Sequence, residues 1–105
     1  MFKTAITRIP CEACRQGLTT ACLGLPDYRK TLQQHLAYIA ALRQIGLSVE
    51  VLEPEPNFPD AHFVEDTAVI FPELAVISRP GVLARRGEIA LIEPVLARQK
   101  SIQWI

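Results

Sequence analysis

Residues 27–52 read DYRKTLQQHLAYIAALRQIGLSVEVL, and this stretch decides the fold. Its apolar residues recur every three or four positions: Tyr28, Leu32, Leu36, Ile39, Leu42 and Ile45. That spacing predicts an amphipathic helix over 27–45. Asp27 stands where an N-cap is expected, and Gly46 stands where a helix commonly ends. The segment 47–52 then predicts a strand, so helix and strand alternate along the chain.

Strand and helix signals continue on both sides of this stretch. The other predicted elements are a strand at 2–9, a loop at 11–26, a loop at 53–59, a hairpin formed by 62–71 and 74–79, a helix at 85–99 and a strand from 101. Pro94 lies inside the second helix, where it removes a backbone donor and should kink it. This order predicts mixed α/β architecture. With 105 residues, we expect 1–105 to form a single small domain rather than two.

Composition excludes several classes of protein. The 11 basic and 11 acidic residues balance, and no basic cluster is present, so we expect no nucleic-acid partner. No apolar run is long enough to span a bilayer, and the N-terminus lacks the apolar segment of a signal peptide. Three cysteines make a poor disulfide framework. We therefore expect a cytoplasmic protein that does not bind membranes.

Three acidic residues, Asp60, Glu65 and Asp66, lie close together in the sequence. Carboxylates bind a planar, permanently charged guanidinium through paired hydrogen bonds, so the cluster predicts a cation-binding pocket. The alternative is solvated acids at the mouth of a hairpin, because acids usually lie at the surface. Glu65 and Asp66 would point to opposite faces of a regular strand, so they share one site only where the backbone turns.

Arg85 and Arg86 open the predicted second helix, where a cation opposes the helix dipole. A locally unfavourable placement can mark a functional position, and an arginine there can bind a carboxylate through two hydrogen bonds. The alternative is that Glu88 and solvent neutralise both arginines.

Cys11 and Cys14 have C-x-x-C spacing, and Cys22 and His35 follow further along. A structural zinc site needs four ligands, and a redox pair needs a thioredoxin-like context. We expect no metal and no cofactor, although a small Cys-based metal or redox protein stays open as an alternative. We expect His35 to pack against its helix rather than bind a metal. We expect His62 to lie at the surface or to be hydrogen-bonded.

Two motifs, FPDAHFVEDTAVI at 58–70 and SRPGVLARRGE at 78–88, closely resemble the dimethylarginine dimethylaminohydrolase family. The opening of the chain resembles it too, through ITRIP at 6–10, GLTT at 17–20 and LGLPDYRKTLQQHLAYIAAL at 23–42. This family belongs to the guanidine-modifying superfamily, with arginine deiminases and amidinotransferases. The chain is similar to the family's N-terminal portion.

The resemblance implies a partial α/β propeller of the pentein type, to which this chain would supply about two of the five ββαβ modules. It also implies hydrolysis of an N-methylated arginine to citrulline and an alkylamine. In the family, a cysteine thiolate attacks the guanidinium carbon and a histidine acts as acid and base. Both residues lie beyond residue 105 in the family, so the resemblance places no catalytic residue in this chain and implies no turnover by it alone.

The resemblance also implies roles for individual residues. Asp66 would hold the guanidinium, and Glu65 would support the catalytic histidine. Asp60 and the backbone carbonyl of Leu18 would take the substrate α-amino group. Arg85 would take the α-carboxylate, so the expected partner is a small guanidino molecule.

Two departures from the family pattern affect the second helix more than the pocket: Ala84 replaces a usual serine, and Pro94 is unusual. The loop 17–24 would be a lid.

A non-catalytic module that binds guanidino ligands stays open as an alternative function. A propeller fragment exposes sheet edges, so we expect a homo-oligomer or pairing with a C-terminal part.

Overall fold

The computed structural model describes residues 2–12 and 27–105, which fall into two compact units, Met1–His62 and Phe63–Ile105. Both units contain strands and helix, so the predicted mixed α/β architecture is confirmed. Within the described residues, no helix is both long enough and apolar enough to cross a membrane.

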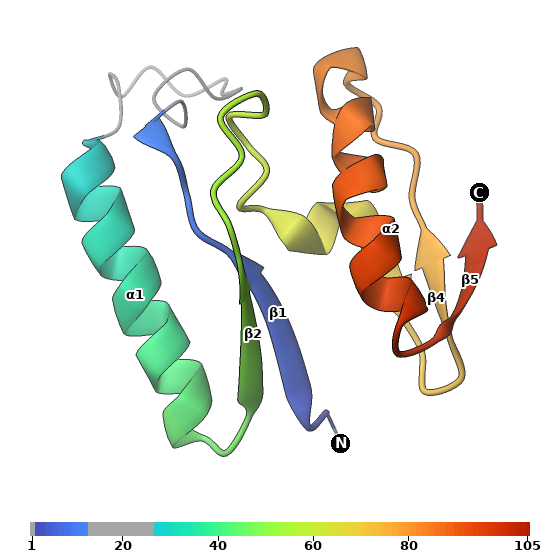
Figure 1. Ribbon diagram of the computed structural model, residues 1–105, viewed down its shortest axis with the longest axis horizontal. Helices are drawn as coiled ribbons and strands as arrows, with labels where there is room; N and C mark the ends of the chain where they lie inside the picture. Colours follow the sequence, from blue (N-terminus) through green and yellow to red (C-terminus); the bar gives the residue numbers. More distant parts are fainter. Residues whose placement is uncertain (1, 13–26) are drawn as a thin grey trace. The chain divides into compact units, whose positions relative to one another are not determined.

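The first unit is a strand–helix–strand arrangement (Figure 1). Strands β1 (Thr4–Arg8) and β2 (Ser48–Leu52) are parallel, with Thr4 opposite Ser48 and Arg8 opposite Leu52. Parallel neighbours need a crossover connection, and α1 (Tyr28–Gln44) forms part of it. The helix contacts β2.

Both predicted ends of α1 are confirmed. The Asp27 side chain accepts a hydrogen bond of 3.2 Å from the Lys30 backbone N–H, which satisfies one donor of the first turn. At the other end, Gly46 has φ of 95°, a conformation that favours glycine. Its N–H bonds to the Arg43 carbonyl, and the Leu47 N–H bonds to the Leu42 carbonyl, which is the Schellman pattern.

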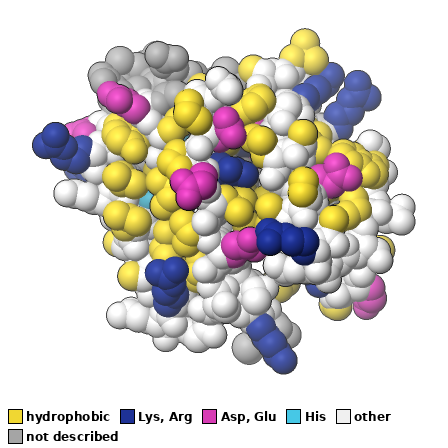
Figure 2. Space-filling view, viewed as in Figure 1, with side chains coloured by type: hydrophobic (Ala, Val, Ile, Leu, Met, Phe, Trp, Pro, Cys, Tyr) yellow, Lys and Arg dark blue, Asp and Glu magenta, His cyan; other side chains and the backbone are white. Residues whose placement is uncertain are grey.

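The apolar stripe of α1 is only partly covered. Ile39 is buried, whereas Leu36 is 50% exposed and Ile45 is 75% exposed. Figure 2 shows one face of the molecule, on which hydrophobic side chains lie at the surface among charged ones. The helix therefore forms with less burial of its apolar side chains than the sequence spacing suggests.

The second unit begins with η2 (Val64–Thr67), a short 3₁₀ helix, followed by the hairpin of β3 (Ala68–Ile70) and β4 (Leu74–Ile77). These strands are antiparallel, with Ala68 opposite Ile77, so the predicted hairpin is confirmed. The prediction of strand from residue 62 is wrong for residues 64–67. The Asp66 N–H bonds to the Phe63 carbonyl there, which turns the backbone before the strand begins.

The chain continues through η3 (Leu83–Glu88), a second 3₁₀ helix, into α2 (Ile89–Ala97) and β5 (Ser101–Trp104). Strand β5 pairs in parallel with β4, beside which it lies in Figure 1, and the sheet order is β3-β4-β5. The predicted strand from residue 101 is therefore confirmed. The α-helix begins at Ile89 rather than at 85, so the prediction that Arg85 and Arg86 open an α-helix is wrong.

The core of the second unit lies where α2 contacts β4 and β5. Its buried apolar residues are Ala75, Ile77, Ile92, Val95 and Leu96. Ala75 and Ile77 alternate on β4 with the less buried Leu74 and Val76, as expected for a strand with one covered face. Pro94 lies inside α2 and is exposed, so the helix continues through it and it does not occupy the core.

Candidate functional site

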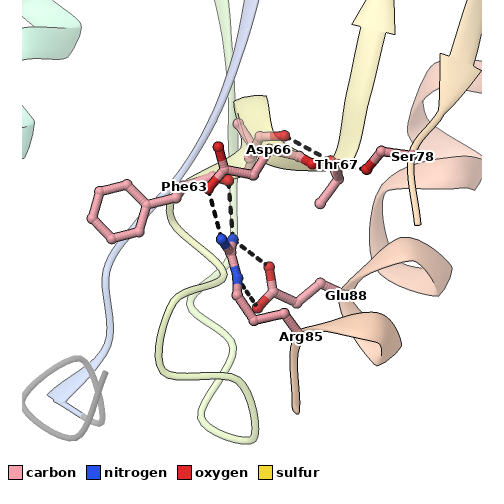
Figure 3. A network of polar contacts seen from close by, with 7 residues as sticks. Phe63, Asp66, Thr67, Ser78, Arg85 and Glu88 are labelled. Carbon is pink, nitrogen blue, oxygen red and sulfur yellow. Dashed lines mark hydrogen bonds and ion pairs between the residues drawn. The ribbon is translucent and has the colours of Figure 1, made fainter. Parts of the chain in front are cut away.

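The 3₁₀ turn of η2 sets the position of Asp66. The Thr67 hydroxyl, on a side chain that is almost completely buried, donates a hydrogen bond of 2.6 Å to the Val64 carbonyl. The Ser78 hydroxyl donates a bond of 2.8 Å to the Asp66 carbonyl, and the Ser78 N–H donates one of 2.9 Å to the Thr67 carbonyl. The end of β4 therefore holds the backbone at Asp66 through bonds that fix its local conformation (Figure 3).

The 3₁₀ turn of η3 sets the position of Arg85 in the same unit. The Arg85 N–H donates a hydrogen bond of 3.0 Å to the Val82 carbonyl, which forms the turn. Next to it, the Arg86 Nε donates a bond of 2.8 Å to the Pro80 carbonyl. The two adjacent arginines thus have different environments, because the Arg86 guanidinium is bonded to backbone while that of Arg85 reaches carboxylates.

Arg85 joins two carboxylates in one network (Figure 3). Its Nε and Nη2 donate to the two oxygens of Glu88, at 3.0 and 2.8 Å, and its Nη1 donates to Asp66 Oδ2 at 2.6 Å. A further bond of 3.2 Å runs from Nη2 to the Phe63 carbonyl. Two hydrogen bonds from one guanidinium edge to one carboxylate give the strongest type of protein ion pair.

The two carboxylates differ sharply in burial. The Glu88 side chain is 3% exposed, the Arg85 side chain 15% and the Asp66 side chain 53%. Hydrogen bonding to Glu88, and then to Asp66, raises the pKa of Arg85 above its ordinary value, although partial burial opposes the rise. Arg85 therefore remains charged, and two carboxylates facing one guanidinium give the network an excess of negative charge.

Of the residues predicted to form the site, the structure brings Asp66 and Arg85 into direct contact. Glu65 lies beside Asp66 in η2 and is exposed, so the backbone turn that the sequence required for both acids is present. Asp60 is buried in the first unit. Leu18 and the predicted lid 17–24 lie outside the described residues.

From the sequence, Glu88 is predicted only to neutralise the nearby arginines, and its burial and paired hydrogen bonds with Arg85 are not predicted. Its spacing of three residues from Arg85 was the available signal, because side chains at this spacing lie over one another in a 3₁₀ turn. The bond to the Phe63 carbonyl left no signal in the sequence, since any residue can supply a backbone oxygen.

Of the residues behind the metal or redox alternative, the structure describes Cys11 and His35. Within 2–12 and 27–105, no group of three or more His, Cys, Asp and Glu side chains is placed to hold a metal ion. Cys11 is buried, and its thiol donates to the Glu55 carbonyl at 3.4 Å. Cys14 and Cys22 lie outside the described residues.

The two histidines belong to the first unit. Burial, and then the proximity of His62, lowers the pKa of His35. The His35 ring lies 6.2 Å from that of Tyr38 between centroids, in a tilted arrangement. His35 is thus a partly covered helix residue, as predicted.

Comparison with known proteins gives a consistent result, although no family model matches the chain. The chain is 45% identical over 98 residues to N(G),N(G)-dimethylarginine dimethylaminohydrolase of Pseudomonas aeruginosa. It is 36% identical over 105 residues to the protein of the same name from Streptomyces coelicolor. These matches cover 93% and 98% of the chain.

Solved structures agree with the sequence matches. The whole chain superposes with a TM-score of 0.96 and 39% identity on a mutant of the Pseudomonas aeruginosa enzyme in complex with citrulline. It superposes equally well, with 41% identity, on a dimethylarginine dimethylaminohydrolase adduct with S-methyl-L-thiocitrulline. This chain is a homologue of the N-terminal portion of dimethylarginine dimethylaminohydrolase. The resemblance seen in the sequence is therefore confirmed.

The match is partial in length. The chain spans 39% and 41% of the two dimethylarginine dimethylaminohydrolase sequences, and 42% of each of the two solved chains. The Asp66–Arg85–Glu88 network thus lies in a segment that represents about two fifths of such a protein.

Proposed function

We propose that this chain is the N-terminal, substrate-binding part of a hydrolase that converts an N-methylated arginine to citrulline and an alkylamine. The observation that carries the proposal is the pairing of Asp66 with Arg85, in a chain that superposes along its whole length on a citrulline-bound relative. One acid and one base in contact are complementary to a small molecule that has a cationic head and an anionic group.

In the proposed complex, Asp66 accepts hydrogen bonds from the guanidinium of the ligand, and Arg85 donates to its α-carboxylate. The excess negative charge of the network favours a cationic ligand. Because Asp66 and Arg85 touch each other at 2.6 Å, a ligand whose charged ends are separated by an aliphatic chain must separate them. Ligand binding therefore exchanges one ion pair for two.

The remaining residues have supporting roles in this proposal. Asp60 and the Leu18 carbonyl take the α-amino group, and Glu65 supports the catalytic histidine. The nucleophilic cysteine and that histidine are supplied by sequence beyond this stretch. The chain accordingly forms about two of the five ββαβ modules of a pentein-type propeller, and the order β3-β4-α2-β5 in the second unit supports this assignment.

The binding test uses three ligands that differ in one charged group each. L-arginine has both groups, agmatine lacks the carboxylate, and citrulline has an uncharged ureido group. Asp66→Asn should weaken L-arginine and agmatine but spare citrulline. Arg85→Met should weaken L-arginine and citrulline but spare agmatine. We expect losses of about tenfold or more, because a hydrogen bond to a charged group contributes ~1.5–3 kcal/mol.

Isothermal titration calorimetry of the purified chain measures these affinities, and Arg79→Met, which removes an exposed arginine of the same unit, is the control. Absence of binding heat from the unmodified chain at millimolar ligand would contradict the proposal. So would equal losses for all three ligands in both variants.

The same material tests the assignment of catalysis to the missing sequence. We expect no citrulline from dimethylarginine with the 105-residue chain, because no nucleophile is proposed within it. Citrulline formation by the pure chain would instead require a nucleophile among these residues. A chain that bound these ligands but remained inert when combined with a C-terminal part would be a non-catalytic binding module.

We also propose that the chain acts in the cytoplasm, and that it either self-associates or pairs with a C-terminal part. Exposed apolar side chains support association, notably Trp104 of β5, at 53% exposure, and Ile105, at 80%. Sedimentation velocity should show a species larger than the monomer, and a monomer at all concentrations would exclude self-association.

A further inference from the structure

Glu88 is distinctive because it combines almost complete burial with a negative charge. Its side chain is 3% exposed, and both of its oxygens accept hydrogen bonds from Arg85. Burying a carboxylate without a partner is strongly unfavourable, so Glu88 needs the hydrogen bonds that Arg85 donates to it. A ligand in solvent has little access to this side of the guanidinium.

Asp66 meets the same guanidinium under opposite conditions. Its side chain is 53% exposed, and it contacts Nη1, whereas Glu88 contacts Nε and Nη2. An ion pair whose carboxylate is reached by solvent contributes little to stability, because water replaces the lost interaction. The Asp66 contact can therefore be exchanged for a ligand at small cost, while the Glu88 contact cannot.

From this asymmetry we propose that Glu88 is a positioning residue, which fixes the Arg85 guanidinium through Nε and Nη2 so that its Nη1 side exchanges Asp66 for the carboxylate of a ligand. The ligand-binding half of this statement rests on the proposed function. The positioning half rests on the burial of Glu88, its two hydrogen bonds from Arg85 and the geometry of η3, where residues three apart lie over one another.

Positioning by Glu88 has a consequence that a purely structural role lacks. Without the paired bonds to Glu88, Arg85 would present its donors in more orientations, and the carboxylate of a ligand would lose a preorganised partner. Glu88→Gln keeps the size of the side chain but removes its charge and one acceptor oxygen. Preference for L-arginine over agmatine should fall by about tenfold, whereas the affinity for agmatine itself should change little.

Nuclear magnetic resonance tests the positioning directly and without ligand. The Arg85 Nε–H signal, identified by its loss in Arg85→Lys, should exchange slowly with water in the unmodified chain. Asp66→Asn should leave that exchange rate nearly unchanged. Glu88→Gln should accelerate it by at least about tenfold, Glu88→Asp should partly restore it, and Glu73→Gln, at an exposed turn between β3 and β4, is the control.

The possible outcomes separate this inference from the proposed function. Faster exchange in Asp66→Asn, or unchanged exchange in Glu88→Gln, overturns the positioning role. If Glu88→Gln does not fold, the exposed Asp66 variant still decides the matter. If the unmodified chain binds no guanidino ligand, the proposed function fails while the exchange rates still test positioning. Ligand binding with an undiminished preference for L-arginine in Glu88→Gln rejects the positioning role alone.

Discussion

The two units each shield an arginine, but they give it different partners. In the first unit, Arg8 is 7% exposed and donates a hydrogen bond of 2.8 Å to the Glu53 carbonyl, which ties β1 to the segment that follows β2. In the second unit, Arg85 bonds two carboxylates, one buried and one exposed. The Arg8 guanidinium stabilises the fold, because its partner is a backbone carbonyl that cannot move away unless the local structure unfolds.

The difference between the partners of Arg8 and Arg85 indicates which of the two arginines is suited to exchange a partner for a ligand. Both arginines are stabilised, yet only Arg85 has a partner side chain, Asp66, that solvent already reaches. Exposed ion pairs are easily replaced, whereas buried ones with full hydrogen bonding are not. The burial of the partner, rather than that of the arginine, therefore distinguishes the two sites.

The largest effect on stability is expected from a core substitution in the second unit, which carries the Asp66–Arg85–Glu88 network. Ile77 is fully buried on β4, next to Ser78, whose hydroxyl and N–H hold the backbone around Asp66. Ile77→Ala should lower the free energy of unfolding by about 2–5 kcal/mol through lost contacts and a cavity. Urea denaturation followed by circular dichroism measures the change.

The matched control is Val69→Ala, because Val69 lies on the neighbouring strand β3 but is 54% exposed. Its cost should stay within about 0.5 kcal/mol. Equal costs for the two substitutions would show that Ile77 does not anchor the unit that carries Arg85.

A smaller effect, but the sharpest test of the comparison, comes from Arg8→Met. Loss of the hydrogen bond to the Glu53 carbonyl should lower the free energy of unfolding by about 1–3 kcal/mol. Affinity for L-arginine should remain unchanged, in contrast to the loss expected for Arg85→Met. Urea denaturation and calorimetry on both variants measure the two quantities, and a comparable loss of affinity in Arg8→Met would remove the distinction between the two arginines.

The elements with local signals were predictable from the sequence. The limits of α1 follow from Asp27, whose side chain caps the helix, and from Gly46, whose positive φ ends it. The hairpin follows from two apolar runs around Pro72-Glu73. Each of these features depends on residues adjacent in the chain, which is the range over which sequence patterns are informative.

The elements that depend on distant contacts were not predictable. Residues 64–67 lie in the mostly apolar stretch 62–71 for which a strand is predicted, but a 3₁₀ turn forms there and Ser78, twelve residues away, bonds to its Asp66 carbonyl. The helix α2 begins at Ile89 rather than at 85, and it follows η3, whose Arg85 bonds to Asp66, 19 residues away in the chain. Tertiary hydrogen bonds thus override local propensity at both ends of the network.

The site was predicted as separate groups, and the structure shows two of them joined. Asp66 and Arg85 were expected to hold opposite ends of a ligand, whereas they hold each other at 2.6 Å in this structure. Charge and spacing identify such residues, but not whether they neutralise one another, because that depends on the turns that carry them. The burial of Glu88 could not be predicted from the sequence for the same reason, because it depends on how the chain folds around this side chain.

The smallest expected effect concerns pH and the first unit. Burial, and then the proximity of His62, lowers the pKa of His35 below its ordinary value of 6.5. The unfolded chain therefore binds a proton at His35 more readily than the folded chain, so the stability contributed by neutral His35 is complete above pH 6.5 and declines as the pH falls below it.

His35→Gln should remove this part of the pH dependence. Its urea midpoint should fall less than that of the unmodified chain between about pH 7.5 and about pH 5.5, a range in which histidine is the main titrating side chain. Carboxylates contribute equally to both proteins, so the difference between the two declines reports His35 together with its electrostatic coupling to His62. Arg85 should contribute nothing to either decline, because its raised pKa keeps it charged throughout this range. Identical declines would mean that His35 titrates alike in the folded and unfolded chains, and the pH response of the first unit would then have to come from groups other than its helix histidine.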